Sequence, residues 1–306
     1  MAVMKPDPSD ESTSGPNKFI FTIRILSTFD EFRRAEIIQR DIWDITDYTE
    51  IVPKDVLIIA QKNGGLTLGA FNPANEMVGV LFGFPGRKPD QPWKHCSHMM
   101  GVIPSYRTAG IGEALKNFQR EIVLGQGLNL ITWTVNPLEG VNASLNFGKL
   151  GVICRHYYPN AYGEMTDGLN HGLPSDRFEV EWWLDSPRVI QRLTQKSGQI
   201  RLADLVHASA KFINRTVLEN DIRLPGKINL AIDAPILLLE VPANFQSIKT
   251  ISLSNALAWI ECTRSVFETC FENDYIISEF ISESNLAGER RNYFVLQHDL
   301  SKILDH

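Results

Sequence analysis

The fold of this chain is decided by the stretch Met99-Met100-Gly101-Val102-Ile103-Pro104-Ser105-Tyr106-Arg107-Thr108-Ala109-Gly110-Ile111-Gly112. Its apolar beginning predicts a buried strand, which Pro104 ends because proline has no N–H to donate to a strand ladder. The turn that follows reads Arg-x-x-Gly-x-Gly, and apolar residues at helical spacing come after it. A strand, a glycine-rich turn and a helix in this order place the N–H groups of a helix N-terminus at the turn, where they can bind a phosphate group.

The turn has two interpretations, a tight strand-to-helix connection or a phosphate-binding loop. Gly110 and Gly112 leave room for backbone N–H groups to surround an anion. The dinucleotide-binding fingerprint fits poorly, because no acidic ribose partner is evident about 20 residues further on. The nucleotide-triphosphate loop fits no better, since Glu113 and Ala114 stand where that motif has Lys and then Ser or Thr.

Composition excludes several classes of protein. The 306 residues carry a net charge of −6 without a concentrated basic run, so we expect no nucleic-acid partner. No apolar run reaches the roughly 18 residues that a membrane span needs. The four cysteines form no Cys-x-x-Cys pair, which is typical of a reduced, cytoplasmic protein. We expect no metal site, because His95 and His98 lie three apart on a predicted strand and face opposite sides.

The predicted order of elements is strand, helix, helix, hairpin, strand, helix, strand, helix, strand, strand. Asp30 is the expected N-cap of the first helix, and Pro53 stands where the second begins. The predicted strands cover residues 19–25, 66–71, 77–84, 128–135, 152–157 and 177–184, in addition to the one that opens the quoted stretch. The predicted helices cover residues 30–43, 53–63, 111–125 and 141–150.

The Arg-x-x-Gly-x-Gly turn in this order of elements resembles the coenzyme A signature of the GNAT superfamily of N-acetyltransferases. Other segments look like a poorly characterised bacterial branch of that superfamily with a long C-terminal extension. These segments are His98-Met99-Met100-Gly101-Val102, Ile131-Thr132-Trp133-Thr134, Asn142-Ala143, Lys149-Leu150-Gly151, Asn160-Ala161-Tyr162-Gly163, and Asp176-Arg177 through Glu181-Trp182. The resemblance implies an α/β (α+β) fold with a mixed, mostly antiparallel central sheet flanked by helices.

Three parts of the chain are expected. Residues 1–17 are rich in Pro, Ser and Asp and predict a disordered tail without a signal peptide. Residues 18–184 would form the GNAT-like, acyl-CoA-binding domain. Residues 185–306 would form the extension, which predicts a strand (236–241), a helix (254–271) and two strands (275–281 and 292–297).

This β-α-β-β layout of the extension is also that of the second half of a GNAT domain. One hypothesis is therefore a half-GNAT-like unit that completes the main sheet or packs on its face. The other is a small independent α+β cap. No second Arg-x-x-Gly-x-Gly occurs in the extension, so a second coenzyme site is not expected.

The resemblance implies an acyl-CoA-dependent N-acyltransferase in which the primary amine of a small molecule attacks the thioester directly. Acetyl-CoA or another short acyl-CoA would be the co-substrate. The pantetheine arm would lie between the strands that end near Val102 and Thr134, and backbone amides with Arg107 would hold the pyrophosphate. The coenzyme-binding residues implied are Met100, Val102, Arg107, Thr108, Ala109, Gly110, Ile111, Gly112 and Asn142.

The residue expected to protonate the leaving thiolate is absent. The superfamily places a tyrosine in a Tyr-x-x-Leu-Gly setting, and this chain has Phe147 there. Tyr157 and Tyr162 are the candidate acids nearby, and His98 is a candidate base or else a buried structural histidine. Phe147 favours the alternative hypothesis of a non-catalytic acyl-CoA-binding or sensor module. A homodimer is possible.

Overall fold

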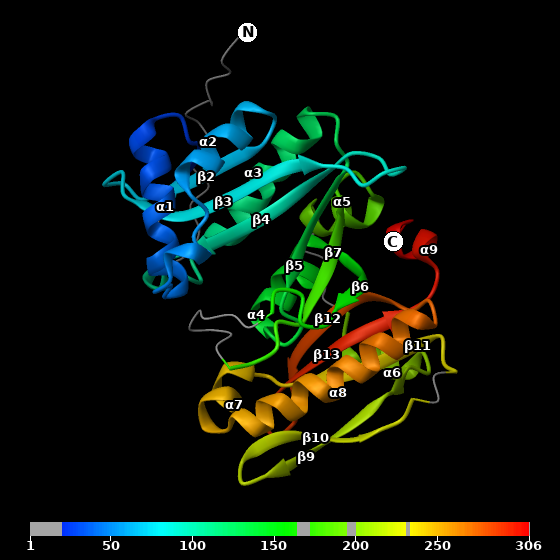
Figure 1. Cartoon of the computed structure of the whole chain (residues 1–306). Coiled ribbons are helices and arrows are strands. Elements are labelled where there is room, and N and C mark those ends of the chain that lie inside the picture. Colours follow the sequence, from blue (N-terminus) through cyan, green and yellow to red (C-terminus); the bar gives the residue numbers. More distant parts are fainter. Residues whose placement is uncertain (1–19, 164–171, 195–199, 231–232, 306) are drawn as a thin grey trace.

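The computed structural model describes residues 20–163, 172–194, 200–230 and 233–305. Its strands form an 11-stranded sheet in the order β1-β2-β3-β4-β5-β7-β6-β12-β13-β11-β8, and β9 and β10 form a separate pair (Figure 1). The pairs β4–β5 and β8–β11 are parallel, and the other pairs described are antiparallel. The expected mixed, mostly antiparallel sheet flanked by helices is thus confirmed. The predicted tail of residues 1–17 lies outside the described residues.

The strands and helices follow one another along the chain without long interruptions. The strands are β1 (Thr22–Ile25), β2 (Leu66–Phe71), β3 (Met77–Gly86), β4 (Lys94–Val102), β5 (Leu130–Val135), β6 (Ile153–Tyr158), β7 (Arg177–Trp183), β8 (Lys211–Phe212), β9 (Asn214–Glu219), β10 (Ile222–Ile228), β11 (Ile236–Val241), β12 (Ile276–Ser284) and β13 (Arg290–Gln297). The helices are α1 (Phe29–Trp43), α2 (Lys54–Lys62), α3 (Ile111–Gly125), α4 (Gly140–Ala143), α5 (Pro187–Thr194), α6 (Leu202–His207), α7 (Phe245–Ile251), α8 (Leu253–Glu272) and α9 (Leu300–Asp305). Three short helical turns complete the order, η1 (Tyr48–Glu50), η2 (Pro104–Tyr106) and the π-helical η3 (Ser144–Leu150).

The start of α1 differs from the sequence prediction. Thr28, not Asp30, is the N-cap: its hydroxyl accepts a hydrogen bond from the Glu31 N–H, and the Glu31 carboxylate accepts one from the Thr28 N–H. Asp30 lies within the first turn. The reciprocal Thr28–Glu31 pair is a capping box, which satisfies two N–H groups at once and therefore outweighs a single carboxylate cap.

Helices cover both faces of the N-terminal half of the sheet. Val80 and Phe82 of β3 pack in one cluster with the buried face of α1 and with α2. Leu81, between them, points to the opposite face and packs with Ile111 and Leu115 of α3. This alternation of a buried strand fixes which helix lies on which side (Figure 1).

The C-terminal extension contributes strands to the same sheet. Its strand β12 lies beside β6, with Ile277 opposite Cys154 in an antiparallel pair. Beyond this junction the spatial order β12-β13-β11 mirrors the order β6-β7-β5, with the same antiparallel pairings. A further parallel neighbour follows on each side, β8 beside β11 and β4 beside β5. The β9–β10 pair stands in the chain between β8 and β11, where α3 stands between β4 and β5.

A single aromatic cluster joins the two halves. The Phe178 ring lies 4.7 Å from the Phe267 ring and 5.5 Å from the Phe294 ring, measured between centroids. Phe147 lies 5.6 Å from Phe294. Phe147 and Phe178 belong to the N-terminal part and the other two to the extension, so the hydrophobic core crosses the β6–β12 junction. No helix in the described ranges is both long and apolar enough to cross a membrane.

Candidate functional site

The parallel strands β4 and β5 separate from each other and leave a gap in the sheet. They pair only where His95 faces Ile131 and Cys96 faces Thr132. From Ser97 to Val102, β4 stays bonded to β3 on its other side. The edge of β4 that faces β5 has no partner strand there among the strands described, and Figure 1 shows the two strands diverging. Its backbone N–H and C=O groups are available to an extended ligand.

A cavity of about 520 Å³ occupies this gap. Its lining comes from both faces of the sheet. The α1 side contributes Trp43, Ile45, Glu50 and Val52, and the α3 side contributes Lys116, Asn142, Leu145 and Asn146. The two strands contribute the walls between these faces, from Ser97 to Met100 and from Trp133 to Asn136. One cavity therefore has approaches from two sides of the sheet.

The start of α3 fits a phosphate group. Gly110 is the N-cap with φ +80°, a left-handed conformation that favours glycine, and no side chain caps the helix. The first helical hydrogen bond runs from the Ala114 N–H to the Gly110 carbonyl. The N–H groups of Ile111, Gly112 and Glu113 thus have no partner within the helix. A Cβ on Gly112 would lie 3.6 Å from the Met100 side chain, so the wall beside this glycine is close but not clashing.

Arg107 ties the turn to α1. Its Nη2 donates to the carbonyl of Ile42 at 2.8 Å, and its Nε donates to the carbonyl of Val102 at 3.3 Å. The Nε–Nη2 edge of the guanidinium is therefore already hydrogen-bonded to two backbone carbonyls. Its contact with a pyrophosphate stays a prediction, which requires the Nη1 edge or another rotamer.

The other expected coenzyme-binding residues fall into two places. Met100 and Asn142 line the cavity. Val102 ends β4, Thr108 to Gly110 form the turn before α3, and Ile111 and Gly112 are the first residues of α3. His98 also lines the cavity, with its ring 6.0 Å from the Phe82 ring and 6.4 Å from the Phe84 ring. His98 is exposed, so the alternative of a buried structural histidine is wrong, and partial desolvation lowers the pKa of its imidazole.

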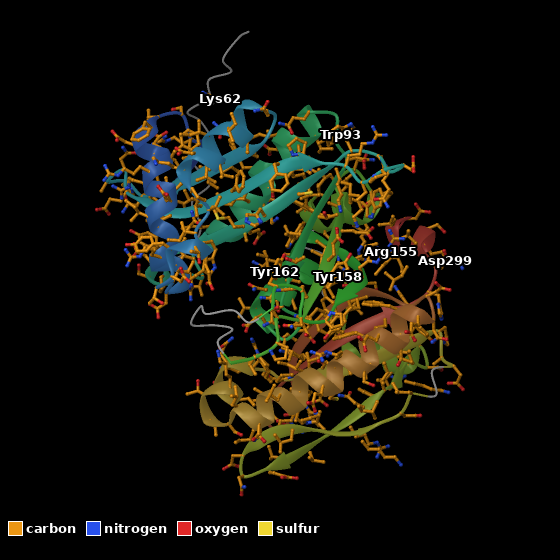
Figure 2. All side chains as sticks on the ribbon, viewed as in Figure 1. Lys62, Trp93, Arg155, Tyr158, Tyr162 and Asp299 are labelled. Carbon is orange, nitrogen blue, oxygen red and sulfur yellow. The ribbon has the colours of Figure 1, made fainter. Side chains whose placement is uncertain are left out.

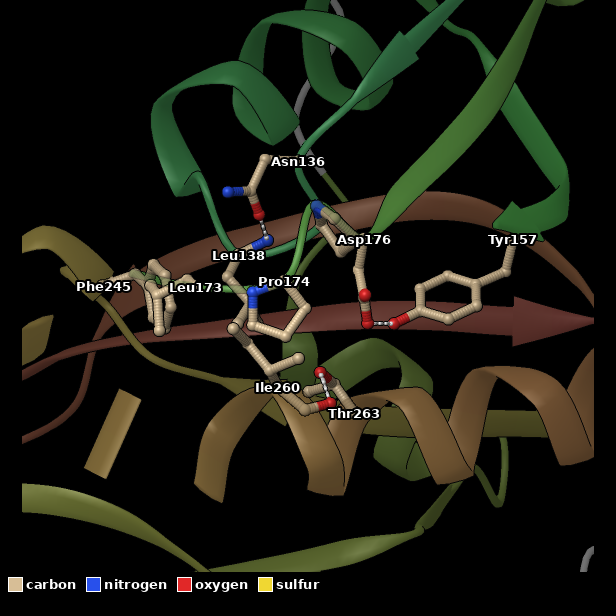
Figure 3. Close-up of a pocket in the computed structure, with 10 residues that line it drawn as sticks. Asn136, Leu138, Tyr157, Leu173, Pro174, Asp176, Phe245, Ile260 and Thr263 are labelled. Atoms are coloured by element: carbon tan, nitrogen blue, oxygen red, sulfur yellow. Dashed lines mark hydrogen bonds between the residues drawn. The ribbon is translucent and has the colours of Figure 1, made fainter. Parts of the chain in front are cut away.

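The structure brings Tyr162, but not Tyr157, to the cavity. Tyr162 lies on the loop after β6 (Figure 2), and its hydroxyl is hydrogen-bonded to the Thr134 hydroxyl at 2.7 Å. The Tyr157 hydroxyl instead donates to the Asp176 carboxylate (Figure 3), and its ring packs against Phe178 and Phe267. Burial raises the pKa of Tyr157, and the bond to Asp176 raises it further.

The small pocket in Figure 3 lies where residues of the N-terminal part and of the extension pack together. Its volume of about 10 Å³ holds at most about one water molecule. The Asp176 carboxylate beside it also accepts two hydrogen bonds from Arg264 of α8, at 2.7 and 2.9 Å. Burial acts to raise the pKa of Asp176, but the bonds from Arg264, Tyr157 and the Asn160 N–H outweigh it and lower the pKa. Tyr157 therefore belongs to a network that fixes the β6–β7 connection to the extension.

Phe147 does not face the cavity. It is fully buried against Phe294, within the π-helical turn Ser144–Leu150. A π-helical turn bonds residues five apart, which rotates successive side chains relative to an α-helix. Its neighbour Asn146 lines the cavity instead.

Three ionisable residues that line the cavity, Glu50, Glu139 and Lys116, were not predicted from the sequence. Glu139 precedes α4 and accepts a hydrogen bond from Gln246 of α7 in the extension. Burial raises the pKa of Glu139, against the lowering effects of Gln246, Lys249 and Arg177. Lys116 of α3 is almost fully buried. In the part of the chain that the structure describes, no cluster of His, Cys, Asp or Glu has a metal-binding arrangement.

Comparisons with known proteins found similar solved structures but no match in sequence. No protein-family model matches the chain, and no curated protein sequence matches it. Among solved structures, the ribosomal-protein-S18-alanine N-acetyltransferase from Escherichia coli is similar over 59% of this chain and 100% of its own, with 14% identity and a TM-score of 0.43. A GNAT-family acetyltransferase from Streptococcus pneumoniae is similar over 53% of this chain and 98% of its own, with 14% identity and a TM-score of 0.42. The activities in these names are those of the two similar proteins.

Proposed function

We propose that this protein is an acyl-CoA-dependent N-acyltransferase that acts on the primary amine of a small molecule. The observation that carries the proposal is the cavity between β4 and β5, which has lining residues on both faces of the sheet. Two of these residues, Met100 and Leu145, lie beside Gly112 at the uncapped start of α3. A donor and an acceptor can therefore meet inside the sheet from opposite sides.

The donor would bind on the α3 side. The N–H groups at the start of α3 would hold the pyrophosphate, because they lack helical partners and carry the positive end of the helix dipole. The unpaired edge of β4 between Ser97 and Val102 would hydrogen-bond the amide groups of the pantetheine arm as an added strand would. The co-substrate is acetyl-CoA or another acyl-CoA.

The reaction needs one base and one acid. The amine nitrogen attacks the thioester carbonyl carbon, the C–N bond forms, and the C–S bond breaks. Glu139 takes the proton from the amine, because its raised pKa makes the carboxylate a stronger base than that of an ordinary glutamate. Tyr162 gives a proton to the leaving thiolate, and His98 is a neutral second base in the same cavity.

Binding and turnover test the proposal separately. Acetyl-CoA at about 100 times its Kd should stabilise the native protein by roughly 2.7 kcal/mol, which a melting experiment detects. A panel of amines is then screened for thiol release above the hydrolysis background. Tight binding without thiol release for any amine would support the alternative, a non-catalytic acyl-CoA-binding module, which Phe147 favours. The absence of any stabilisation at millimolar acyl-CoA contradicts both.

A further inference from the structure

Lys116 is a buried lysine that lines the cavity. Its side chain is 1% exposed and lines the gap between β4 and β5 from the α3 side. The Nζ donates to Ser97 Oγ at 2.9 Å and to Gln119 Oε1 at 3.2 Å, and it lies 3.5 Å from the centroid of the Trp133 ring. A hydroxyl oxygen, an amide oxygen and an aromatic face surround the Nζ, and each can interact with it in the protonated form.

The structure gives Lys116 no counter-charge. Ser97, Gln119 and Trp133 are neutral, and none of the carboxylates in the described ranges forms an ion pair with Lys116. Burial alone lowers the pKa of Lys116 well below the usual value. An ammonium that is removed from water without an anion nearby costs free energy, which a carboxylate in the cavity would recover.

Lys116 stands at the closed end of the cavity, where the strands come together. Ser97 directly follows the last residue of β4 that pairs with β5, and Trp133 directly follows its counterpart on β5. Lys116 lies in the second turn of α3, behind the turn that would hold the pyrophosphate. A donor arm that runs along the edge of β4 from Val102 toward Ser97 therefore ends with its acyl group beside the Lys116 ammonium.

Resting on the proposed function, we infer that Lys116 selects acyl-CoA thioesters whose acyl chain ends in a carboxylate. Lys116, Ser97 and Trp133 form the floor of an acyl pocket that pairs this carboxylate with the ammonium. The acceptor amine approaches from the α1 side and does not need this cation. An uncharged acyl chain of the same length leaves the ammonium unpaired.

The test measures direct binding of three ligands to the full chain: CoA, butyryl-CoA and succinyl-CoA. The butyryl and succinyl groups have the same number of carbons. The native protein should bind succinyl-CoA at least about tenfold more tightly than butyryl-CoA, because the carboxylate pairs with a buried charge. Lys116→Met keeps an unbranched side chain of nearly the same length and removes the amino group. It should lose or reverse this preference while binding CoA as before. Lys149→Met is the matched control, since Lys149 is an exposed lysine paired with Glu113 in the first turn of α3. It should keep the preference.

The outcomes separate this inference from the proposed function. Equal binding of succinyl-CoA and butyryl-CoA, or an unchanged preference in Lys116→Met, overturns the inference and leaves the proposed function in place. Failure of all three ligands to bind overturns the proposed function. Acyl transfer to the Lys116 amine, seen as a mass increase on its peptide, also overturns the role as a carboxylate receptor. The comparison of the two donors on the native protein decides the question even if Lys116→Met does not fold.

Discussion

Two tyrosines that look equivalent in the sequence differ in their surroundings. Tyr162→Phe should lower kcat by about 100-fold or more with an unchanged Kd for acyl-CoA, because proton donation to the thiolate helps only the transition state. Steady-state kinetics and a separate binding measurement check both values.

Tyr157→Phe is the matched control for that experiment. It removes the hydroxyl that donates to Asp176, outside the cavity. We expect it to lower the free energy of unfolding by about 1–2 kcal/mol and to leave kcat unchanged. The reverse result, with Tyr157→Phe inactive and Tyr162→Phe active, would show that the acid acts from the other side of β6.

The raised pKa of Glu139 predicts a particular pH dependence. Activity requires the ionised carboxylate, so kcat/KM should rise as the pH increases through the raised pKa of Glu139, above the value of about 4.3 for an ordinary glutamate. Glu139→Gln should remove this rising limb and slow the reaction. His98→Gln, in the same cavity, should keep it; loss of the limb in His98→Gln alone would assign the base to His98 instead.

At the scale of an element, the start of α3 gives a test with a control on the same helix. Gly110 and Gly127 both have left-handed conformations, φ +80° and +78°, and a Cβ on either would meet no atom within 4 Å. Valine at either position should cost about 1–2 kcal/mol of stability through backbone strain. Only Gly110→Val should also abolish stabilisation by acyl-CoA, because Gly127 lies beyond the far end of α3. Loss of the effect in both variants would contradict a phosphate site at Gly110.

The elements that sequence patterns predicted are those with a clear period. The alternation of residues 177–182 and the apolar stripe of residues 111–125 reappear in β7 and α3. The two residues of β8 show no period, and the β9–β10 pair is polar and half-exposed, so neither was predicted. At α1, Thr28 and Asp30 are both good N-caps, and only the Glu31 partner of Thr28 decides between them.

The site was predictable only in part, for a physical reason. The left-handed N-cap of α3 falls on Gly110 of the Arg-x-x-Gly-x-Gly turn, so the sequence shows this feature directly. The direction of Phe147 depends on a π-helical turn that has no sequence period of its own. Lys116 lies on a helix, where a lysine is ordinarily a solvated residue, and its burial follows only from the gap between two strands distant in the sequence.

At the scale of the whole molecule, the shared core predicts a single unfolding event. Phe294 of the extension is fully buried between Phe147 and Phe178 of the N-terminal part. Phe294→Ala should therefore destabilise both parts together by about 3–5 kcal/mol. Circular dichroism and the fluorescence of the tryptophans should follow one coincident transition at a lower temperature.

The control for this prediction is Leu286→Ala, because Leu286 is fully exposed in the same extension. It should change the stability by less than about 0.5 kcal/mol. Two separate transitions, of which only one moves in Phe294→Ala, would instead indicate an independent cap.

The cavity that crosses the sheet also has a consequence for the order of events in turnover. The proposed function has thioester and amine enter this cavity from opposite faces, so that neither has to leave before the other enters. The reaction then passes through a complex that holds both substrates. Double-reciprocal plots of initial velocity against acyl-CoA concentration, at several fixed amine concentrations, should therefore intersect. Parallel lines, the mark of a covalent acyl-enzyme, would mean that the two substrates use the same side in turn.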